Sequence, residues 1–175
     1  FALLFPSKGL SWASVRHSLQ WWMQRQVSAK RTWPARELLE CSLQNPNQQP
    51  QRWVQTRYLV GEAGVYLTSI LDKKVSRGET FWICDGGMHH HLAASGNLGQ
   101  IIRKNYPVVN PLHVNEGDRA QISITGPLCT PLDILAAKHT IAEANVGDVI
   151  AVMQSGAYGA SASPKDFLSH PHAAE

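Results

Sequence analysis

Cys129 lies in a segment whose composition constrains the backbone around it. The segment, residues 126–133, reads GPLCTPLD and places a proline on each side of the cysteine. Because proline fixes its own φ angle and lacks a backbone N–H, we expect the thiol to point in a defined direction. A thiol held in this way can act as a nucleophile or as a proton donor. The alternative is a buried, unreactive cysteine, which is the commoner setting for this side chain.

Tyr158 is a second candidate for chemistry. It lies in the segment GAYG, residues 156–159, which closely follows the apolar stretch 149–153. Small neighbours allow a ligand or another chain to approach the tyrosine hydroxyl and the backbone. A tyrosine packed at the end of a strand is the alternative.

Charged and metal-ligating residues give weaker indications. Arg103, next to Lys104, could bind a carboxylate or phosphate through its planar guanidinium, although a solvated surface site explains the pair equally well. On a strand, His89 and His91 would share one face and could chelate a metal. No carboxylate or cysteine lies at a convincing spacing from them, so we predict no metal site.

Composition indicates a folded domain. The chain has 175 residues, of which 43% are hydrophobic and 17% are charged. Residues 1–56 carry a net charge of +5 and residues 57–175 a net charge of −2, so the whole is not a uniformly basic nucleic-acid-binding domain. No apolar run approaches the roughly 20 residues that span a bilayer. We therefore expect neither a nucleic-acid nor a membrane partner.

The three cysteines suggest a compartment. Cys41, Cys84 and Cys129 are widely spaced and indicate neither a disulfide framework nor a zinc site. A reducing environment suits such a chain, and we expect a cytoplasmic protein.

The elements that would position these residues are mainly strands. Residues 65–75 and 80–85 flank Ser76-Arg77-Gly78, a pattern typical of a hairpin. Residues 121–125 alternate polar and apolar, and residues 149–153 follow a Gly-Asp turn. Residues 131–138 are predicted to form one or two helical turns. The fold class predicted is mainly β, with a small antiparallel sheet or partial barrel.

The N-terminal residues 1–56 differ in composition from the rest of the chain. Residues 1–56 contain five of the six tryptophans, and residues 14–28 show helical spacing of apolar side chains. We place a boundary near residues 54–57 and predict a partly helical segment before it. Our hypothesis is that residues 1–56 are not native to the domain that follows, as a shifted reading frame would produce.

Four landmarks in order carry a family resemblance. Residues 56–60 (TRYLV), 85–88 (DGGM), 126–129 (GPLC) and 156–158 (GAY) resemble the E-P-G-R, D-A-G-M, G-P-x-C and G-A-Y segments of the group IV pyridoxal-phosphate decarboxylases. The resemblance covers residues 57–175, about two-thirds of the chain. The amino-acid sequence of segments such as DGGMHHHLAASGNLGQIIRKNYPVV is similar to that of the decarboxylases associated with exosortase A systems, which accompany exopolysaccharide loci.

The resemblance implies a fold, a cofactor and a set of roles. It implies a C-terminal β domain of the alanine-racemase type, a lyase that uses pyridoxal 5'-phosphate on a small amino acid, and a homodimer. It assigns Cys129 to catalysis in the neighbouring subunit's site, Arg57 and Tyr158 to cofactor phosphate, and Arg103, Thr130 and Asp133 to substrate. The (β/α)₈ barrel with the cofactor lysine would precede residue 57 and is missing here, so we expect this chain alone to be inactive.

The chain departs from the family pattern at two positions. Val54 stands where the family has a glutamate that pairs with the cofactor ring, and Thr130 replaces an acidic residue that binds a distal amino group. Recognition of ornithine or diaminopimelate is therefore doubtful. A non-catalytic dimerisation or regulatory module is the main alternative, and nucleic-acid binding through the tryptophan-rich front and racemase chemistry are two others.

Overall fold

A computed structural model describes residues 2–4, 60–98, 100–114 and 118–174 of the chain. Its strands are β1 Ala2–Leu4, β2 Gly64–Ser76, β3 Glu79–Cys84, β4 Val108–Val109, β5 Arg119–Thr125, β6 Ile134–Ala142 and β7 Val149–Val152. Two short 3₁₀ turns, η1 Gly61–Ala63 and η2 Phe167–Ser169, are the helical elements among these residues. No helix in this part of the chain is long and apolar enough to cross a membrane.

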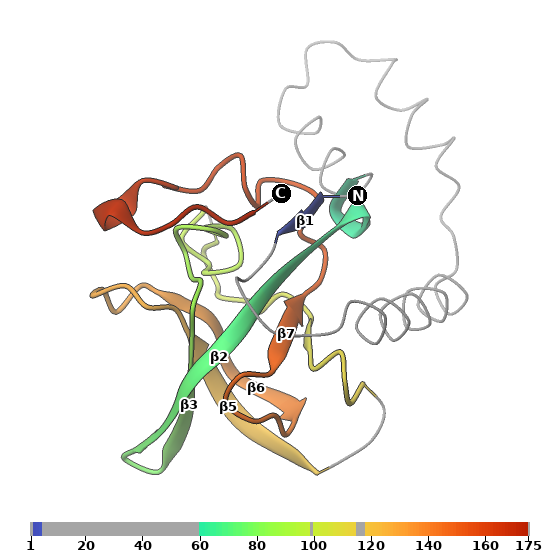
Figure 1. Ribbon diagram of the computed structural model, residues 1–175, viewed down its shortest axis with the longest axis vertical. Coiled ribbons are helices and arrows are strands. Elements are labelled where there is room, and N and C mark those ends of the chain that lie inside the picture. The colour runs from blue at the N-terminus through green and yellow to red at the C-terminus, as the bar shows by residue number, and fades with distance from the viewer. Residues whose placement is uncertain (1, 5–59, 99, 115–117, 175) are drawn as a thin grey trace.

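The strands form one curved sheet in the order β4-β7-β2-β3-β5-β6, with β1 added beside β2 (Figure 1). The edge strands β4 and β6 approach each other, because the ring Nε2 of His139 in β6 lies 2.9 Å from the carbonyl oxygen of Val108 in β4. The sheet is therefore nearly closed. The predicted mainly β fold with a partial barrel is confirmed.

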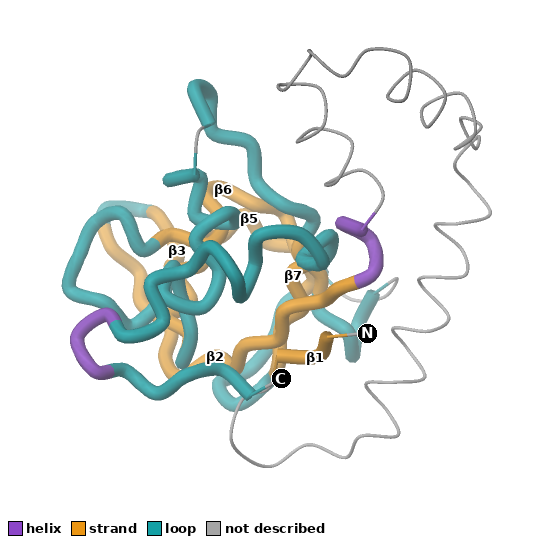
Figure 2. The backbone as a smooth tube through the Cα atoms, turned by 90° about the horizontal axis from the view of Figure 1, so that it is seen from above, coloured by secondary structure: helices purple, strands orange, loops and turns teal. Residues whose placement is uncertain are grey.

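Most strand pairs are antiparallel, as predicted, but two are not. β3 pairs with β5 in parallel, and β1 pairs with β2 in parallel. A parallel pair needs a long connection, and residues 85–118 supply it between β3 and β5. Apart from β4, its described residues are loop, which the tube view draws in teal (Figure 2).

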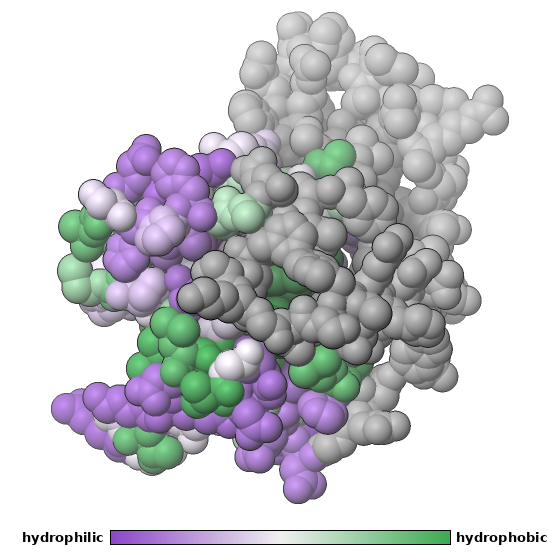
Figure 3. Space-filling view, in the orientation of Figure 1, coloured by the Kyte–Doolittle hydropathy of each residue, from purple (hydrophilic) through white to green (hydrophobic). Residues whose placement is uncertain are grey.

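The predicted hairpin is confirmed. β2 and β3 are joined at Arg77 and Gly78, whose φ angles of 51° and 79° are those of a two-residue hairpin turn. The first half of β2 is buried and pairs with β7, whereas the second half projects with β3 and is mostly exposed. This projecting end carries charged side chains, and the lower part of the space-filling view is accordingly hydrophilic (Figure 3).

The helical prediction for residues 131–138 is wrong, because this region contains the start of β6. An extra residue in β6 relative to β5 lies between the pairs Ile122–His139 and Ile124–Ala136. Lys138 takes a positive φ of 48° at this bulge. A bulge breaks the period-2 alternation by which a strand is recognised, and the alanines of the segment favour a helix.

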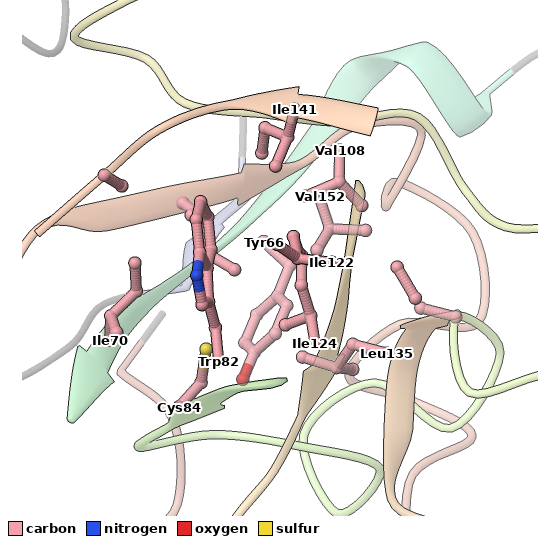
Figure 4. Packing of buried hydrophobic residues seen from close by; sticks show 14 residues of the cluster. Tyr66, Ile70, Trp82, Cys84, Val108, Ile122, Ile124, Leu135, Ile141 and Val152 are labelled. Carbon is pink, nitrogen blue, oxygen red and sulfur yellow. The ribbon is translucent and has the colours of Figure 1, made fainter. Parts of the chain in front are cut away.

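The core lies inside the curve of the sheet (Figure 4). Tyr66 from β2 and Trp82 from β3 are its largest members, and both are at most 2% exposed. They pack with Ile122 and Ile124 from β5 and with Val152 from β7. The core thus joins every long strand of the sheet and gives the loops at its rim a rigid base.

The predicted front segment, residues 1–56, lies outside the described residues except for β1. The boundary at residues 54–57, Val54 and Arg57 lie outside them as well. β2 begins at Gly64, where a Cβ would lie 2.6 Å from the Cα of Gly156. Only glycine permits this close approach of two chain segments.

Candidate functional site

Cys129 is exposed at the connection between β5 and β6. This connection, residues 126–133, is called the cysteine loop below. Its two ends are joined by a bond from the Gly126 N–H to the Asp133 carbonyl oxygen at 3.0 Å, and the Asp133 N–H donates to the carbonyl oxygen of Thr130 at 3.2 Å. The alternative of a buried cysteine does not hold for Cys129, whereas Cys84 is buried in the core.

Asp133 lies inside the fold beneath the cysteine loop, with 2% of its surface exposed. Its Oδ1 accepts a hydrogen bond from the Met88 N–H at 2.6 Å, and its Oδ2 accepts one from the Leu128 N–H at 2.8 Å. Burial raises the pKa of the Asp133 carboxyl, although the two amide bonds act in the opposite direction. Both carboxylate oxygens therefore bind the protein's own backbone at a position where substrate contact was expected.

Residues 85–98, called the histidine loop below, follow β3. Residues 88–90 form a turn, so His89 and His91 do not share the face of a strand. The His89 ring is fully buried, and neither of its nitrogens has a hydrogen-bond partner within the described structure. It contacts the His90 ring with centroids 3.8 Å apart and the ring planes tilted by 45°, and burial lowers the His89 pKa to about 4. No group of three or more His, Cys, Asp or Glu side chains in the described ranges is arranged to hold a metal.

His91 connects the histidine loop to the end of β7. Its Nε2 lies 2.9 Å from the Ser155 hydroxyl oxygen, and that hydroxyl donates to the Val152 carbonyl oxygen at 2.8 Å. The ring must therefore donate through Nε2, while its Nδ1 accepts from the Ala94 N–H at 3.2 Å. Burial lowers the His91 pKa to about 4, so the ring is neutral at pH 7.

Tyr158 lies just beyond Ser155, half-buried, with a φ angle of +60°. The stretch around it, residues 155–163, is called the tyrosine segment. Its far end also binds the histidine loop, because the Leu92 N–H donates to the Ser163 hydroxyl at 2.9 Å. The Ser163 hydroxyl in turn donates to the carbonyl oxygen of Gly159. The histidine loop thus holds the tyrosine segment at both ends.

Arg103 lies beside the cysteine loop, and Thr130 is one of its residues. The exposed Arg103 donates to the carbonyl oxygen of Ile134 at the start of β6, and partial burial lowers the pKa of its guanidinium. Thr130 is half-buried. The Asn97 side chain of the histidine loop donates to the carbonyl oxygen of Leu132 at 3.0 Å. One residue predicted to bind substrate therefore lies beside the loop that carries the thiol, and another lies in that loop.

The arrangement offers a thiol and a phenol on two loops braced by a third. Met88 joins the histidine loop to the cysteine loop, and His91 joins it to the tyrosine segment. An exposed thiol can deliver a proton, and a phenol among small residues can donate to a phosphate. The phenol is thus suited to binding a phosphate and the thiol to proton transfer, and Arg57, the other predicted phosphate contact, lies outside the described residues.

Comparison with known proteins identifies the family. Residues 22–156 match the family described as pyridoxal-dependent decarboxylase, C-terminal sheet domain. This chain belongs to the pyridoxal-dependent decarboxylases. The predicted cofactor, pyridoxal 5'-phosphate, is thereby confirmed as that of the family. The match begins before the boundary predicted at residues 54–57.

Several relatives of these decarboxylases match at the sequence level. The L-glutamyl-[BtrI acyl-carrier protein] decarboxylase of Niallia circulans is 48% identical over 118 residues, which are 66% of this chain and 27% of that protein. The 2-[(L-alanin-3-ylcarbamoyl)methyl]-2-hydroxybutanedioate decarboxylase of Staphylococcus aureus is 35% identical, over 66% of this chain and 30% of that protein. The chain thus spans about a quarter to a third of these relatives.

Solved structures of the family show the same fold. AQ1208 from Aquifex aeolicus aligns with a TM-score of 0.54 and 29% identity, over 61% of this chain and 25% of that one. Diaminopimelate decarboxylase from M. jannaschii aligns with a TM-score of 0.56 and 26% identity, over 66% of this chain and 25% of that one. The sheet described here is therefore the sheet domain of such enzymes.

The histidine loop is the part of the candidate site whose bracing role the sequence did not indicate. The run of three histidines suggested only a metal. Met88 binds Asp133, which lies 45 positions further along the chain, and His91 binds Ser155, which lies 64 positions further along. No local sequence pattern predicts contacts between residues so far apart. The two glycines before the run were a usable signal, because paired glycines allow other chain segments to approach closely.

Proposed function

We propose that this chain is the C-terminal domain of a homodimeric amino-acid decarboxylase and delivers Cys129 to the active site of the neighbouring subunit. The observation that carries the proposal is the exposed thiol on a loop fixed from below by a buried carboxylate. A cysteine that served only the interior of its own domain would have no reason to lie at the tip of such a loop.

Cys129 would act as a proton donor. Decarboxylation breaks the bond between the α-carbon and the carboxylate, releases carbon dioxide, and leaves an electron pair that must be protonated. The cofactor, when bound, supplies an electron sink for that pair. The Cys129 thiol gives its proton to the carbon, and solvent then reprotonates the thiolate. No oxidant or reductant is required.

Tyr158 and Arg57 would bind the cofactor phosphate. The Tyr158 hydroxyl can donate one hydrogen bond, and the small residues beside it leave room for the phosphate oxygens. Arg57 would add a charged, bidentate contact. Tyr158 and Cys129 would then contribute to different active sites of one dimer, because Cys129 serves the neighbour.

The proposed substrate is an α-amino acid whose far end carries no ammonium group. Thr130 is uncharged and cannot pair with a distal cation, whereas Arg103 nearby favours an anionic or neutral substrate. The Niallia circulans relative acts on an L-glutamyl group carried by an acyl-carrier protein, and the Staphylococcus aureus relative acts on a butanedioate. We propose that the far end here is likewise a carboxylate or a carrier-linked acyl group.

The setting proposed for the protein is a cytoplasmic enzyme encoded with an exosortase A system. The segment of residues 85–109, which contains the whole histidine loop, carries this subtype resemblance. The proposal is supported by the contacts of this segment with both the cysteine loop and the tyrosine segment.

A chimera tests the catalytic assignment. Residues 57–175 replace the aligned segment of the Niallia circulans relative, whose remaining length supplies the rest of an enzyme. We expect carbon dioxide release that depends on pyridoxal phosphate, and a fall in kcat of about 100-fold or more for Cys129→Ala with cofactor absorbance unchanged. Full activity of the Cys129→Ala chimera would instead favour the non-catalytic dimerisation or regulatory module.

Mixed dimers test the assignment to the neighbouring subunit. One chimera lacks the cofactor lysine and keeps Cys129, and the other keeps the lysine and carries Cys129→Ala. If Cys129 serves the neighbour, each heterodimer has one intact site, and mixing restores roughly a quarter of wild-type activity. If thiol and lysine act within the same subunit, mixing restores none.

A further inference from the structure

Asp133 binds the cysteine loop in a way that no other described side chain does. Its carboxylate accepts the Leu128 N–H, which belongs to the residue directly before Cys129, and the Met88 N–H from the histidine loop. Its backbone accepts from Gly126 and donates to Thr130. One residue therefore closes the base of the loop, braces its tip from below and joins it to a second loop.

Two glycines make room for this carboxylate. A Cβ at Gly87 would lie 2.1 Å from Oδ1 of Asp133, and a Cβ at Gly126 would lie 2.3 Å from its Oδ2. Neither glycine has a positive φ, so backbone conformation alone does not require them. Both glycines are therefore explained by the space that the buried carboxylate occupies.

We infer that Asp133 is the positioning residue for Cys129, holding its thiol in a fixed direction by bonding the cysteine loop to the histidine loop, and that it contacts no substrate. The catalytic consequence rests on the proposed function, whereas the positioning itself does not. Without the carboxylate, the amides of Leu128 and Met88 would be buried without acceptors, and such groups are costly to leave unpaired. The loop would then open toward solvent.

A thiol-specific nitroxide label on Cys129 measures the positioning directly. For this experiment Cys41 is replaced by serine so that it takes up no label, and Cys84 is protected from labelling because it is buried in the core. We expect an immobilised spectrum in the otherwise unchanged chain and a mobile one in Asp133→Asn, because the amide NH₂ cannot accept a bond. Exchange of the Leu128 amide hydrogen should become about tenfold faster or more, while exchange in β5 stays unchanged.

Asp148→Asn is the matched control. The Asp148 carboxylate also accepts a backbone N–H within a turn, from Asn145 at 2.6 Å, but this turn precedes β7 and has no contact with the cysteine loop. The label at Cys129 should remain immobilised in this variant. A purely structural role for Asp133 would lower the unfolding midpoint of Asp133→Asn and leave the label immobile in that variant, as in Asp148→Asn.

Gly87→Ala provides a second route to the same effect. The added methyl displaces the carboxylate, so it should free the label as Asp133→Asn does, and the double variant should be no more mobile than either single one. An immobile label in folded Asp133→Asn or Gly87→Ala overturns the inference. Should both variants unfold, a mobile label in the parent chain overturns it as well, because the inference requires a fixed thiol there.

The chimera separates this inference from the proposed function. If both hold, Asp133→Asn lowers kcat about tenfold or more and leaves KM within about twofold of the parent value. Raising the substrate concentration then does not restore the rate. If Cys129→Ala retains full activity while the label in Asp133→Asn becomes mobile, the catalytic role of Cys129 fails and the positioning role of Asp133 stands.

Discussion

Tyr158 shows how much local constraint the site places on one residue. Its φ angle of +60° lies in the left-handed region, which costs a non-glycine residue about 1 kcal/mol or more. The bonds from His91 to Ser155 and from Leu92 to Ser163 fix the chain on either side of it. A strained residue held between two anchors indicates that the direction of its side chain matters.

Replacing Tyr158 tests that direction in the chimera. Tyr158→Phe keeps the ring and removes the hydroxyl, so one hydrogen bond to a charged phosphate is lost. Such bonds contribute about 1.5–3 kcal/mol, and we expect the affinity for pyridoxal phosphate to fall about 10- to 100-fold. Cofactor titration followed by absorbance measures this.

Tyr106→Phe is the control for the loss of a tyrosine hydroxyl. Tyr106 is half-buried and packs edge-on against His91, with ring centroids 5.3 Å apart. Its variant should bind the cofactor as the parent does. An unchanged cofactor affinity in Tyr158→Phe would remove Tyr158 from the phosphate site.

At the scale of the element, the buried histidines of the histidine loop make the stability of the domain depend on pH. The pKa of His91 is about 4 in the folded chain, against 6.5 for an unburied histidine, because burial disfavours the charged ring. Below pH 6.5 the unfolded chain takes up a proton that the folded chain does not. The stabilising contribution of the neutral ring is therefore fully present above pH 6.5 and is lost as the pH falls toward 4.

We expect the free energy of unfolding to fall between pH 6.5 and 4, with a contribution from His91 of at most about 3 kcal/mol. His89, whose pKa is also about 4, acts in the same direction. His91→Gln should reduce the slope of the free energy of unfolding against pH, and urea unfolding at several pH values measures this slope. His113→Gln controls for loss of an exposed imidazole, and an equal slope in His91→Gln and the parent contradicts the assignment.

The strands were predictable where the sequence pattern is local. Residues 65–75 and 80–85 flank a turn that a glycine identifies, and the structure forms that hairpin. Residues 131–138 were mispredicted because the bulge at Lys138 interrupts the alternation. A bulge depends on pairing with β5, which the sequence of β6 alone does not contain.

The site was predictable in part for the same reason. The two prolines indicated a thiol held in a fixed direction but left open whether it is buried, and the structure shows Cys129 to be exposed. The burial of Asp133 was not predictable, because it depends on Met88 and on the two glycines that admit the carboxylate. Sequence patterns thus identified the loops, and tertiary contacts decided which residues face outward.

At the scale of the whole molecule, the domain carries parts of a site rather than a complete one. The edges of the sheet are brought together by His139 and Val108, so the sheet itself is nearly closed. The cysteine loop extends beyond it with an exposed thiol and the exposed side chain of Leu132, which is 54% accessible. An exposed thiol beside an exposed apolar residue suits a loop that is covered by another subunit.

If the substrate lies between two subunits, Thr130 selects its far end. An acidic residue at this position would attract a distal ammonium group, and a threonine does not. We therefore predict that Thr130→Glu in the chimera raises kcat/KM for ornithine about tenfold or more relative to a γ-glutamyl thioester. Parallel assays of carbon dioxide release with the two substrates measure the ratio.

Thr130→Gln separates charge from size, because glutamine has the shape of glutamate without its charge. The ratio should remain near that of the parent in Thr130→Gln, and the gain in Thr130→Glu should shrink at high salt, which screens an accessible ion pair. An equal change in both variants would mean that side-chain volume at position 130 governs selectivity. The far end of the substrate would then be recognised elsewhere, and the absence of an acidic residue here would carry no information about it.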